Sequence, residues 1–397
     1  MSEFRTIREL CSVVVDCPHS TPKWTANGKI VIRNKNIKHG KIDFSSPSYT
    51  DDEHFAQRIK RAKPQPGDII ITREAPIGDV GMIPENTECC LGQRMVLLRA
   101  NQSVCDNFYL LYSLQSLYVQ HQISWSEGTG TTVSNLRIPH LEQIQIPYLP
   151  LEQQAKISSV LRALEEKIEN NRRLNDNLQQ QAAALFESWF VNYDPWDGVQ
   201  PSEWENAPLG SFVEIKRGGS PRPIQDFLSD SGLRWLKISD VTSLSSPFVL
   251  EIKEHIKEEG LRKTVFLHAG ELVLSNSATP GIPKILDVDT CIHDGWLYFP
   301  KSELSKYYLY LFFKHIRKEL VALGNGSVFT NLKTDILKAF PATKADESTL
   351  KEFDVLVTPL FDAMLNADRE NFKLAAMRDA LLPKLMSSEI DVSEVEL

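Results

Sequence analysis

The 397-residue sequence lacks several features that would assign it to a common class of protein. No run of about 18 apolar residues could cross a membrane, and the N-terminal residues have no signal-peptide stretch. The six cysteines form no Cys-x-x-Cys pair, which argues against a zinc module and a disulfide framework. We therefore expect a cytoplasmic protein without a metal site. Cys11 and Cys17 precede His19 in the sequence. We expect both cysteines to be buried thiols rather than metal ligands.

The motifs of common enzymes are also missing. The Gly128-x-Gly130 pair lacks the third glycine of a dinucleotide fingerprint and the Lys-Ser/Thr of a phosphate loop. The nearest match to the Asp/Asn-Pro-Pro-aromatic loop of an adenine methyltransferase, Asn192 to Trp196, contains one proline and follows a helical segment. The sequence thus predicts a binding protein with no catalytic residues and no cofactor of its own.

Acidic residues are in excess, but they are unevenly distributed. The net charge is −8, and residues 344–397 alone hold 6 basic and 12 acidic residues. Residues 1–150 hold 16 basic and 15 acidic residues, and residues 205–343 hold 17 and 16. Because these two segments are almost neutral, they can carry local basic patches, and the acidic total does not exclude a nucleic-acid partner.

What the sequence does contain is an internal repeat. The motif Gly-x-Gly-x4-Asn-Leu that begins at Gly128 recurs 196 positions later at Gly324. Its glycines and hydroxyl-bearing residues can offer hydrogen-bond donors to phosphates, although a plain surface turn is an equal alternative. The segments before the two motifs also share an order of strands and turns, in which Pro66–Arg73 corresponds to Ala269–Asn276.

Two long helices are predicted, each after one of these segments. Residues 151–190 contain no Pro or Gly and would form a helix of about 60 Å at 1.5 Å per residue. Apolar residues follow a heptad pattern in it, and the same register recurs in residues 347–388. Both seams turn polar at the centre, where Asn171, Asn175 and Asn371 can fix the register. We infer that the two helices pack on each other, and the positions of the asparagines permit an antiparallel match; the alternative is that each helix packs on its own domain.

These patterns predict the α+β class: two mixed α/β domains in a pseudo-two-fold repeat, separated by two long helices that form an antiparallel coiled coil. The predicted limits are domain 1 at 1–150, the first helix at 151–190, a linker at 191–204, domain 2 at 205–343, the second helix at 344–390 and an acidic tail at 391–397.

The chain resembles the specificity subunits of type I restriction-modification systems. The first long helix opens with Leu149-Pro150-Leu151-Glu152-Gln153-Gln154 and closes with Leu185-Phe186-Glu187-Ser188-Trp189-Phe190-Val191. Together with the Gly67–Arg73 strand and the two-domain order, these motifs carry the resemblance over essentially the whole chain. The second helix lacks both end motifs, which leaves open whether the two helix ends bind a partner equally.

The resemblance implies two target recognition domains that each read one half of a split site in double-stranded DNA, with the coiled coil as spacer. It implies two modification subunits, which carry S-adenosylmethionine and methylate adenine at N6. It also implies restriction subunits, which use ATP and Mg to translocate and cleave DNA. The alternatives are a coiled-coil scaffold whose domains bind protein or carbohydrate, and a self-sufficient DNA methyltransferase.

Candidate DNA-contacting residues lie at predicted strand ends and turns, where Arg can read guanine, Asn or Gln can read adenine and Lys mostly contacts phosphate. They are Arg33, Lys35, Asn36, Arg73, Arg94 and Thr131 in the first domain, and Arg217, Arg222, Lys237, Asn276, Ser277 and Asn331 in the second. For each one, a solvated surface residue is the alternative. Candidate partner-binding residues are Phe186, Trp189, Phe190, Tyr193 and Trp196, for which core packing is the alternative.

Overall fold

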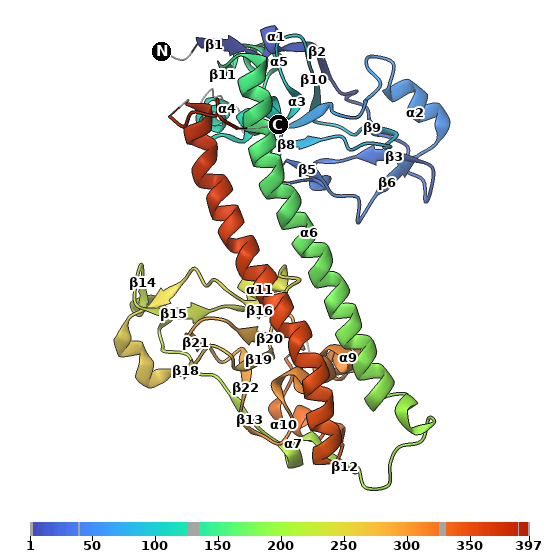
Figure 1. Cartoon of the computed structure of the whole chain (residues 1–397), viewed down its shortest axis with the longest axis vertical. Coiled ribbons are helices and arrows are strands. Elements are labelled where there is room, and N and C mark those ends of the chain that lie inside the picture. The colour runs from blue at the N-terminus through green and yellow to red at the C-terminus, as the bar shows by residue number, and fades with distance from the viewer. Residues whose placement is uncertain (1–2, 39, 126–134, 325–330, 388, 396–397) are drawn as a thin grey trace. The chain divides into compact units, whose positions relative to one another are not determined.

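The computed structural model describes residues 3–38, 40–125, 135–324, 331–387 and 389–395. The chain divides into two compact units, unit 1 (Met1–Lys167 with Leu374–Leu397) and unit 2 (Ile168–Lys373). Each unit contains a mixed α/β body and part of the long helices α6 (Leu151–Phe190) and α11 (Glu347–Met386) (Figure 1). Within the described ranges, no helix has the length and apolarity needed to span a membrane.

The body of unit 1 is built on a four-stranded sheet in the order β2-β10-β7-β8. Its strands are β2 (Cys11–Asp16), β10 (Met95–Ala100), β7 (Ile69–Arg73) and β8 (Ile77–Met82). All five residues of β7 are buried, because this strand is internal to the sheet and apolar residues cover both of its faces. The other strands are β1 (Glu3–Thr6), β3 (Lys29–Ile32), β4 (Ile37–Lys38), β5 (Lys41–Ile42), β6 (Ser48–Thr50), β9 (Cys89–Leu91) and β11 (Gln145–Tyr148). The short helices are α1 (Ile7–Leu10), α2 (Asp52–Arg58), α3 (Asn107–Gln115), α4 (Leu117–Trp125) and α5 (Ile138–Gln143).

The body of unit 2 follows the same plan with two five-stranded sheets. The first has the order β13-β22-β19-β20-β16 and consists of β13 (Val213–Arg217), β22 (Trp296–Ser302), β19 (Leu272–Ser275), β20 (Pro283–Leu286) and β16 (Phe248–Val249). The second has the order β14-β17-β15-β21-β18 and consists of β14 (Leu228–Ser229), β17 (His255–Ile256), β15 (Leu233–Leu236), β21 (Thr290–Ile292) and β18 (Val265–Leu267). A ribbon joins β12 (Glu205–Pro208) to β23 (Pro341–Lys344), and the helices are α7 (Leu209–Phe212), α8 (Ile238–Thr242), α9 (Lys306–Gly324) and α10 (Thr334–Lys338).

The ends of β7 and β19 are built alike. Arg73 N donates to Arg94 O (2.8 Å), and Leu136 N donates to Arg73 O (3.0 Å). In unit 2, Asn276 N donates to Gly295 O (2.8 Å), and Leu332 N donates to Asn276 O (2.7 Å). These paired hydrogen bonds make Arg73 the counterpart of Asn276. They also make Arg94 the counterpart of Gly295.

In unit 2, α6 and α11 lie side by side and run antiparallel (Figure 1). As the residue number rises along α6, the number of its partner on α11 falls. Asn171 contacts Asn371, Asn175 contacts Asp368, and Phe190 packs on Phe353 at 4.8 Å between ring centroids. The apolar seam between them includes Leu178, Ala182, Val357, Phe361 and Met364, all buried.

In unit 1, the start of α6 is fixed to the body by Gln154, which is fully buried. Its Oε1 accepts from Asp106 N (2.9 Å), while its Nε2 donates to Leu149 O (2.7 Å) and Val104 O (3.1 Å). The Leu149–Gln154 motif therefore has a structural purpose, since it anchors the helix. In the same unit, Arg378 of α11 forms an ion pair with Glu165 of α6 at 3.7 Å.

The predicted fold class is confirmed: two sheet-rich α/β bodies are accompanied by two long helices that pair antiparallel. The domain limits expected from the sequence stay a prediction. The six cysteines are buried free thiols.

Candidate functional site

In unit 1 the predicted DNA-contacting side chains that the structure describes lie near the ends of β3 and β7 and in the turn before β10, beside the end of β2. Arg73 is 9% exposed, and its Nη1 donates to both carboxylate oxygens of Asp16 at 2.8 Å. Its Nε donates to Leu136 O (2.9 Å) and its Nη2 to Asn135 Oδ1 (3.2 Å). Because the guanidinium is engaged by the protein itself, its geometry favours a structural role, and base reading by Arg73 stays a prediction.

Other predicted residues of unit 1 surround this buried pair. Asn36 is also buried, with its side chain bonded to Arg33 N (3.0 Å) and Asp43 O (2.9 Å), so it shapes the turn that carries Arg33 and Lys35. Arg33 and Lys35 are exposed. The Arg33 guanidinium lies 5.0 Å from the ring centroid of Trp24, itself 45% exposed.

Arg94 completes the exposed group in unit 1. It has a left-handed backbone (φ +65°), and its side chain is 58% exposed while its Nε lies 3.1 Å from Glu74 Oε2. Asn34 donates to Glu74 O at 2.6 Å, which brings the β3 turn next to Arg94. The structure therefore places Arg33 and Arg94 on one surface. Thr131 lies outside the described residues, as do the Gly128-x-Gly130 loop and Asn325 to Ser327 of its counterpart.

In unit 2 the predicted residues converge on Asp294. Arg217 Nε donates to Asp294 O, and Arg222 Nη2 lies 3.1 Å from Asp294 Oδ2 with the arginine side chain 79% exposed. Asn276, which is 3% exposed, donates from Nδ2 to Asp294 O at 3.4 Å. The buried Oδ1 of Asn276 has no hydrogen-bond partner within the part of the chain that the structure describes. Burial argues that Asn276 supports the turn, and its predicted reading of a base stays a prediction.

The remaining predictions for unit 2 lie around the same turn. Ser277 follows Asn276 in the chain. The exposed Asn331 precedes Leu332, whose backbone N donates to Asn276 O. Lys237, at the end of β15, forms an ion pair with Glu254 instead of facing Asp294 directly. In unit 2, Arg222 thus lies beside the carboxylate of Asp294, and Arg217 beside its main-chain oxygen.

Sequence reasoning missed the acids that organise both surfaces. Ser220 Oγ donates to Asp294 Oδ1 (2.6 Å); this bond and the charges of Arg217 and Arg222 lower the pKa of Asp294, which stays ionised. The neighbouring His293 is largely buried, and burial lowers its pKa, so it is neutral at pH 7. Arginines were favoured because they donate to bases, whereas Asp16 and Asp294 could have been found only as their partners.

The helix-centre asparagines of both seams are placed in unit 2. Asn171 and Asn175 are 4% and 5% exposed. Asn171 Nδ2 donates to Glu370 Oε2 (2.7 Å) and Asn371 Oδ1 (3.0 Å), and Asn175 Nδ2 donates to Asp368 Oδ1 (2.7 Å). All three predicted asparagines therefore lie at the helix interface, while their control of register stays a prediction.

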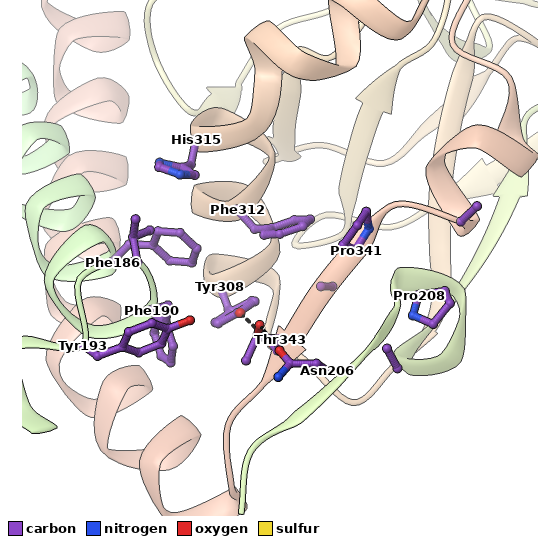
Figure 2. Close-up of a pocket in the computed structure, with 14 residues that line it drawn as sticks. Phe186, Phe190, Tyr193, Asn206, Pro208, Tyr308, Phe312, His315, Pro341 and Thr343 are labelled. Atoms are coloured by element: carbon purple, nitrogen blue, oxygen red, sulfur yellow. Dashed lines mark hydrogen bonds between the residues drawn. The ribbon is translucent and has the colours of Figure 1, made fainter. Parts of the chain in front are cut away.

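A cavity of about 520 Å³ lies at the end of α6 in unit 2. Figure 2 shows Phe186 and Phe190 of α6 on one side of it and Tyr308, Phe312 and His315 of α9 on the other. The ribbon β12–β23 forms a further wall, where Tyr308 donates to Thr343 O (2.7 Å) and Thr343 donates to Asn206 Oδ1 (2.6 Å).

The aromatic residues predicted to bind a partner divide into two groups here. Phe186 and Phe190 are buried, at 3% and 7% exposed, and belong to the core of unit 2. Trp189, Tyr193 and Trp196 are half-buried. Because Phe186, Phe190 and Tyr193 also line the cavity, core packing and access to a partner coexist at this place.

Unit 1 has aromatic side chains at the corresponding place. Phe4 pairs with Pro147 in the β1–β11 ribbon as Asn206 pairs with Thr343 in β12–β23. The Phe4 ring packs on Tyr118 of α4, with 5.5 Å between centroids. Unit 1 thus has a phenylalanine, packed on a tyrosine, at the position that Asn206 occupies in unit 2.

Known proteins resemble the chain over most of its length. The type I restriction enzyme MjaIX specificity subunit of Methanocaldococcus jannaschii is 25% identical over 348 residues, which cover 83% of this chain and 79% of that protein. The type I restriction enzyme HindI specificity subunit of Haemophilus influenzae is 22% identical over 360 residues, with 72% and 78% covered. The crystal structure of a type I restriction-modification S subunit from M. genitalium has the same fold, with a TM-score of 0.60 over 96% of this chain and 95% of that one at 17% identity.

A family model matches each half of the chain separately. The model of the type I restriction modification DNA specificity domain matches residues 3–180 and 201–342, so that one match covers the body of unit 1 and the other the body of unit 2. With the repeated strand ends and the paired helices, this match identifies the chain as a member of the type I restriction-modification DNA specificity subunit family.

Proposed function

We propose that the chain reads an asymmetric, bipartite sequence in double-stranded DNA, with one half-site bound by each unit. The observation that supports this is the exchange of chemistry at one backbone position. Where unit 1 has the exposed Arg94, unit 2 has Gly295, although the backbone hydrogen bonds that define the position are the same. Similar backbone arrangements that carry different side chains suit two half-sites of different sequence.

The exposed groups suit direct readout in the major groove. Arg33 and Arg94 in unit 1 can each donate two hydrogen bonds to guanine O6 and N7. In unit 2, Arg222 can read guanine while the ionised Asp294 beside it can accept from cytosine N4. Lys35 and Lys237 are suited to phosphate contacts, which position the protein without reading sequence.

In this function the chain organises partner enzymes and performs no chemistry itself. Two modification subunits would bring S-adenosylmethionine and methylate adenine, and restriction subunits would bring the ATP- and Mg-dependent translocation and cleavage. The chain would contribute no cofactor and would work in the cytoplasm, where its DNA substrate lies.

The cavity of unit 2 is the proposed docking point for one modification subunit. Its lining includes the aromatic residues Phe186, Tyr308 and Phe312 and the polar residues Asn206 and His315. Interfaces of this kind take an aromatic or aliphatic anchor residue in the centre and polar contacts at the rim.

Sequencing of methylated bases in DNA from cells that express the chain with its cognate modification subunit tests the proposal. We expect one bipartite motif whose two halves differ in sequence and are separated by a fixed number of unspecified bases. The control is the modification subunit alone, which should methylate no motif. Methylation without sequence preference in the presence of the chain would refute the reading function.

A further inference from the structure

A hydrogen-bonded series of polar side chains joins three parts of unit 2 at Asp368 of α11, which is half-buried. Its Oδ1 accepts from Asn175 Nδ2 of α6 (2.7 Å), and its Oδ2 accepts from the hydroxyl of Ser246. Ser246 belongs to the segment that enters β16, at the edge of the sheet that carries the candidate recognition surface. One carboxylate therefore connects both spacer helices to the body of the second recognition domain.

The domain side of this connection is rigid. Lys284 of β20 is 3% exposed, and its Nζ donates to Leu244 O (2.6 Å) and to Ser246 O. Phe248 N donates to Ser246 Oγ (2.9 Å), so that the hydroxyl proton is left to point at Asp368. Through these bonds the position of Ser246 is fixed relative to β20.

A second contact lies next to the first on α11. Arg369 donates to the two carboxylate oxygens of Asp287 at 2.9 and 2.6 Å, and Asp287 follows β20 directly. The Arg369 side chain is 50% exposed, so water screens this pair more than the Asp368 chain.

The repeat supplies a comparison for these residues. Arg172 and Arg173 of α6 stand 196 positions before Asp368 and Arg369, and both are exposed and pair with Glu169 of their own helix. The polar connection at Asp368 is thus a property of one copy of the repeat and not of the common fold.

The energetics indicate that the hydrogen bonds among Asn175, Asp368 and Ser246 orient the parts that they join and do not add net stability. Burial raises the pKa of Asp368, which reflects the cost of keeping a charge there. Asn175 Oδ1 is buried and has no hydrogen-bond partner among the described residues. Well-packed apolar side chains would cost less at such a place, but they would not impose the directions that hydrogen bonds impose.

We propose that Asp368 is a positioning residue, which holds the second recognition domain at one height and one angle on the spacer helices, so that the complex accepts one spacing between its half-sites. This inference rests on the proposed reading of a bipartite site. A change of one base pair moves a half-site by about 3.4 Å and turns it by about 35°. The hydrogen bond from Ser246 to Asp368, which joins the domain to α11, does not survive such a displacement.

The test is methylated-base sequencing with the chain carrying Asp368→Ala or Ser246→Ala, each expressed with the modification subunit. Both variants should keep the two half-site sequences. They should raise the share of methylated sites whose spacer differs by one base pair by about tenfold, the factor that a hydrogen bond to a charged group provides. The matched control is Asp176→Ala, because Asp176 is an exposed carboxylate next to Asn175 and should leave the spacing unchanged.

The outcomes separate the inference from the function on which it rests. A single, unchanged spacer in both variants, with or without reduced methylation, overturns the role of Asp368, since a merely structural residue lowers occupancy without altering spacing. If Asp368→Ala fails to fold, the milder Ser246→Ala decides. Absence of any bipartite motif with the unsubstituted chain would instead reject the proposed function.

Discussion

Arg73 and Asn276 occupy the same place in the two units, at the end of a buried strand, with the same two backbone hydrogen bonds. In unit 1 the long guanidinium reaches Asp16 at the end of β2, two strands away in the sheet. In unit 2 the shorter amide reaches only the adjacent turn at Asp294. The backbone fixes where each side chain starts, and side-chain length decides which neighbour it can bind.

A second pair of positions shows a hydrogen bond that occurs in both units, with the donor and the acceptor on exchanged elements. In unit 1, Ser158 of α6 donates to Asp106 before α3 at 2.5 Å. In unit 2, Ser305 before α9 donates to Asp354 of α11 at 2.5 Å. Donor and acceptor have changed places between body and helix, and the bond length is the same. The repeat therefore preserves the junction of helix and body, while the exposed surface diverges.

The largest expected effect is a difference in stability between substitutions at the two strand ends. Arg73→Ala should lower the free energy of unfolding of unit 1 by roughly 3–5 kcal/mol, because it leaves Asp16 largely buried without its main partner. Asn276→Ala should cost unit 2 only about 1–2 kcal/mol, since it removes one weak hydrogen bond. Denaturant titration of both variants measures the difference.

The control for this comparison is Arg94→Ala, whose ion pair with Glu74 is exposed. It should change the free energy of unfolding by less than about 1 kcal/mol. If Arg73→Ala unfolds at the same denaturant concentration as Arg94→Ala, the Arg73–Asp16 pair is not a structural bond.

The difference between Arg73 and Arg94 also marks what the sequence could predict. Heptad spacing places apolar residues on one helix face wherever the helix lies, so the paired helices followed from periodicity alone. An arginine at a strand end is a candidate base reader by type, but whether it is free depends on residues distant in the sequence. Arg73 is bound by Asp16, 57 positions away, and Arg222 by Asp294, 72 positions away. A local sequence pattern cannot reveal an ion-pair partner that lies so far away along the chain.

The second expected effect concerns specificity. Arg94→Ala should weaken discrimination at one base of the first half-site by about 1–3 kcal/mol and leave the second half-site unchanged. Arg222→Ala should do the reverse. Methylated-base sequencing of each variant checks both expectations. Loss of preference in both half-sites from one substitution would show that the units do not read independently.

The third effect compares the cavity of unit 2 with the corresponding place in unit 1. His315 precedes Arg317 and Leu320, which lie beside Gly281, as Tyr118 precedes Gln120 and Ile123, which lie beside Gly78. His315 and Asn206 therefore correspond to the tilted aromatic pair Tyr118 and Phe4. The double variant Asn206→Phe/His315→Tyr should fill part of the cavity of unit 2 with the same two rings.

If the cavity holds a modification subunit, this variant should weaken binding of one of the two subunits by about tenfold. Mass measurement of the purified complex at graded concentrations would then show one modification subunit for each chain where the unsubstituted chain holds two. The matched control, Phe4→Asn/Tyr118→His, alters unit 1 in the opposite sense and should keep both subunits. Full occupancy by the filled variant would remove the cavity from the docking surface.

The smallest expected effect concerns the polar centre of the helices. Asn171 and Asn371 bond to each other at 3.0 Å, and replacing both by leucine removes the two partners of this bond together. Because apolar pairs stabilise a helix interface more than a buried amide pair, the double variant should raise the free energy of unfolding by about 1 kcal/mol.

The same change should loosen the register, since leucine packs in several positions along a seam where the amide pair bonds in one. Disulfide trapping between cysteines introduced one helical turn apart on α6 and α11 measures register directly. The unsubstituted chain should give one cross-link, and the double leucine variant should give two. A single cross-link together with higher stability would show that the register is set by the apolar seam and by the Asn175–Asp368 bond. The double variant keeps that bond.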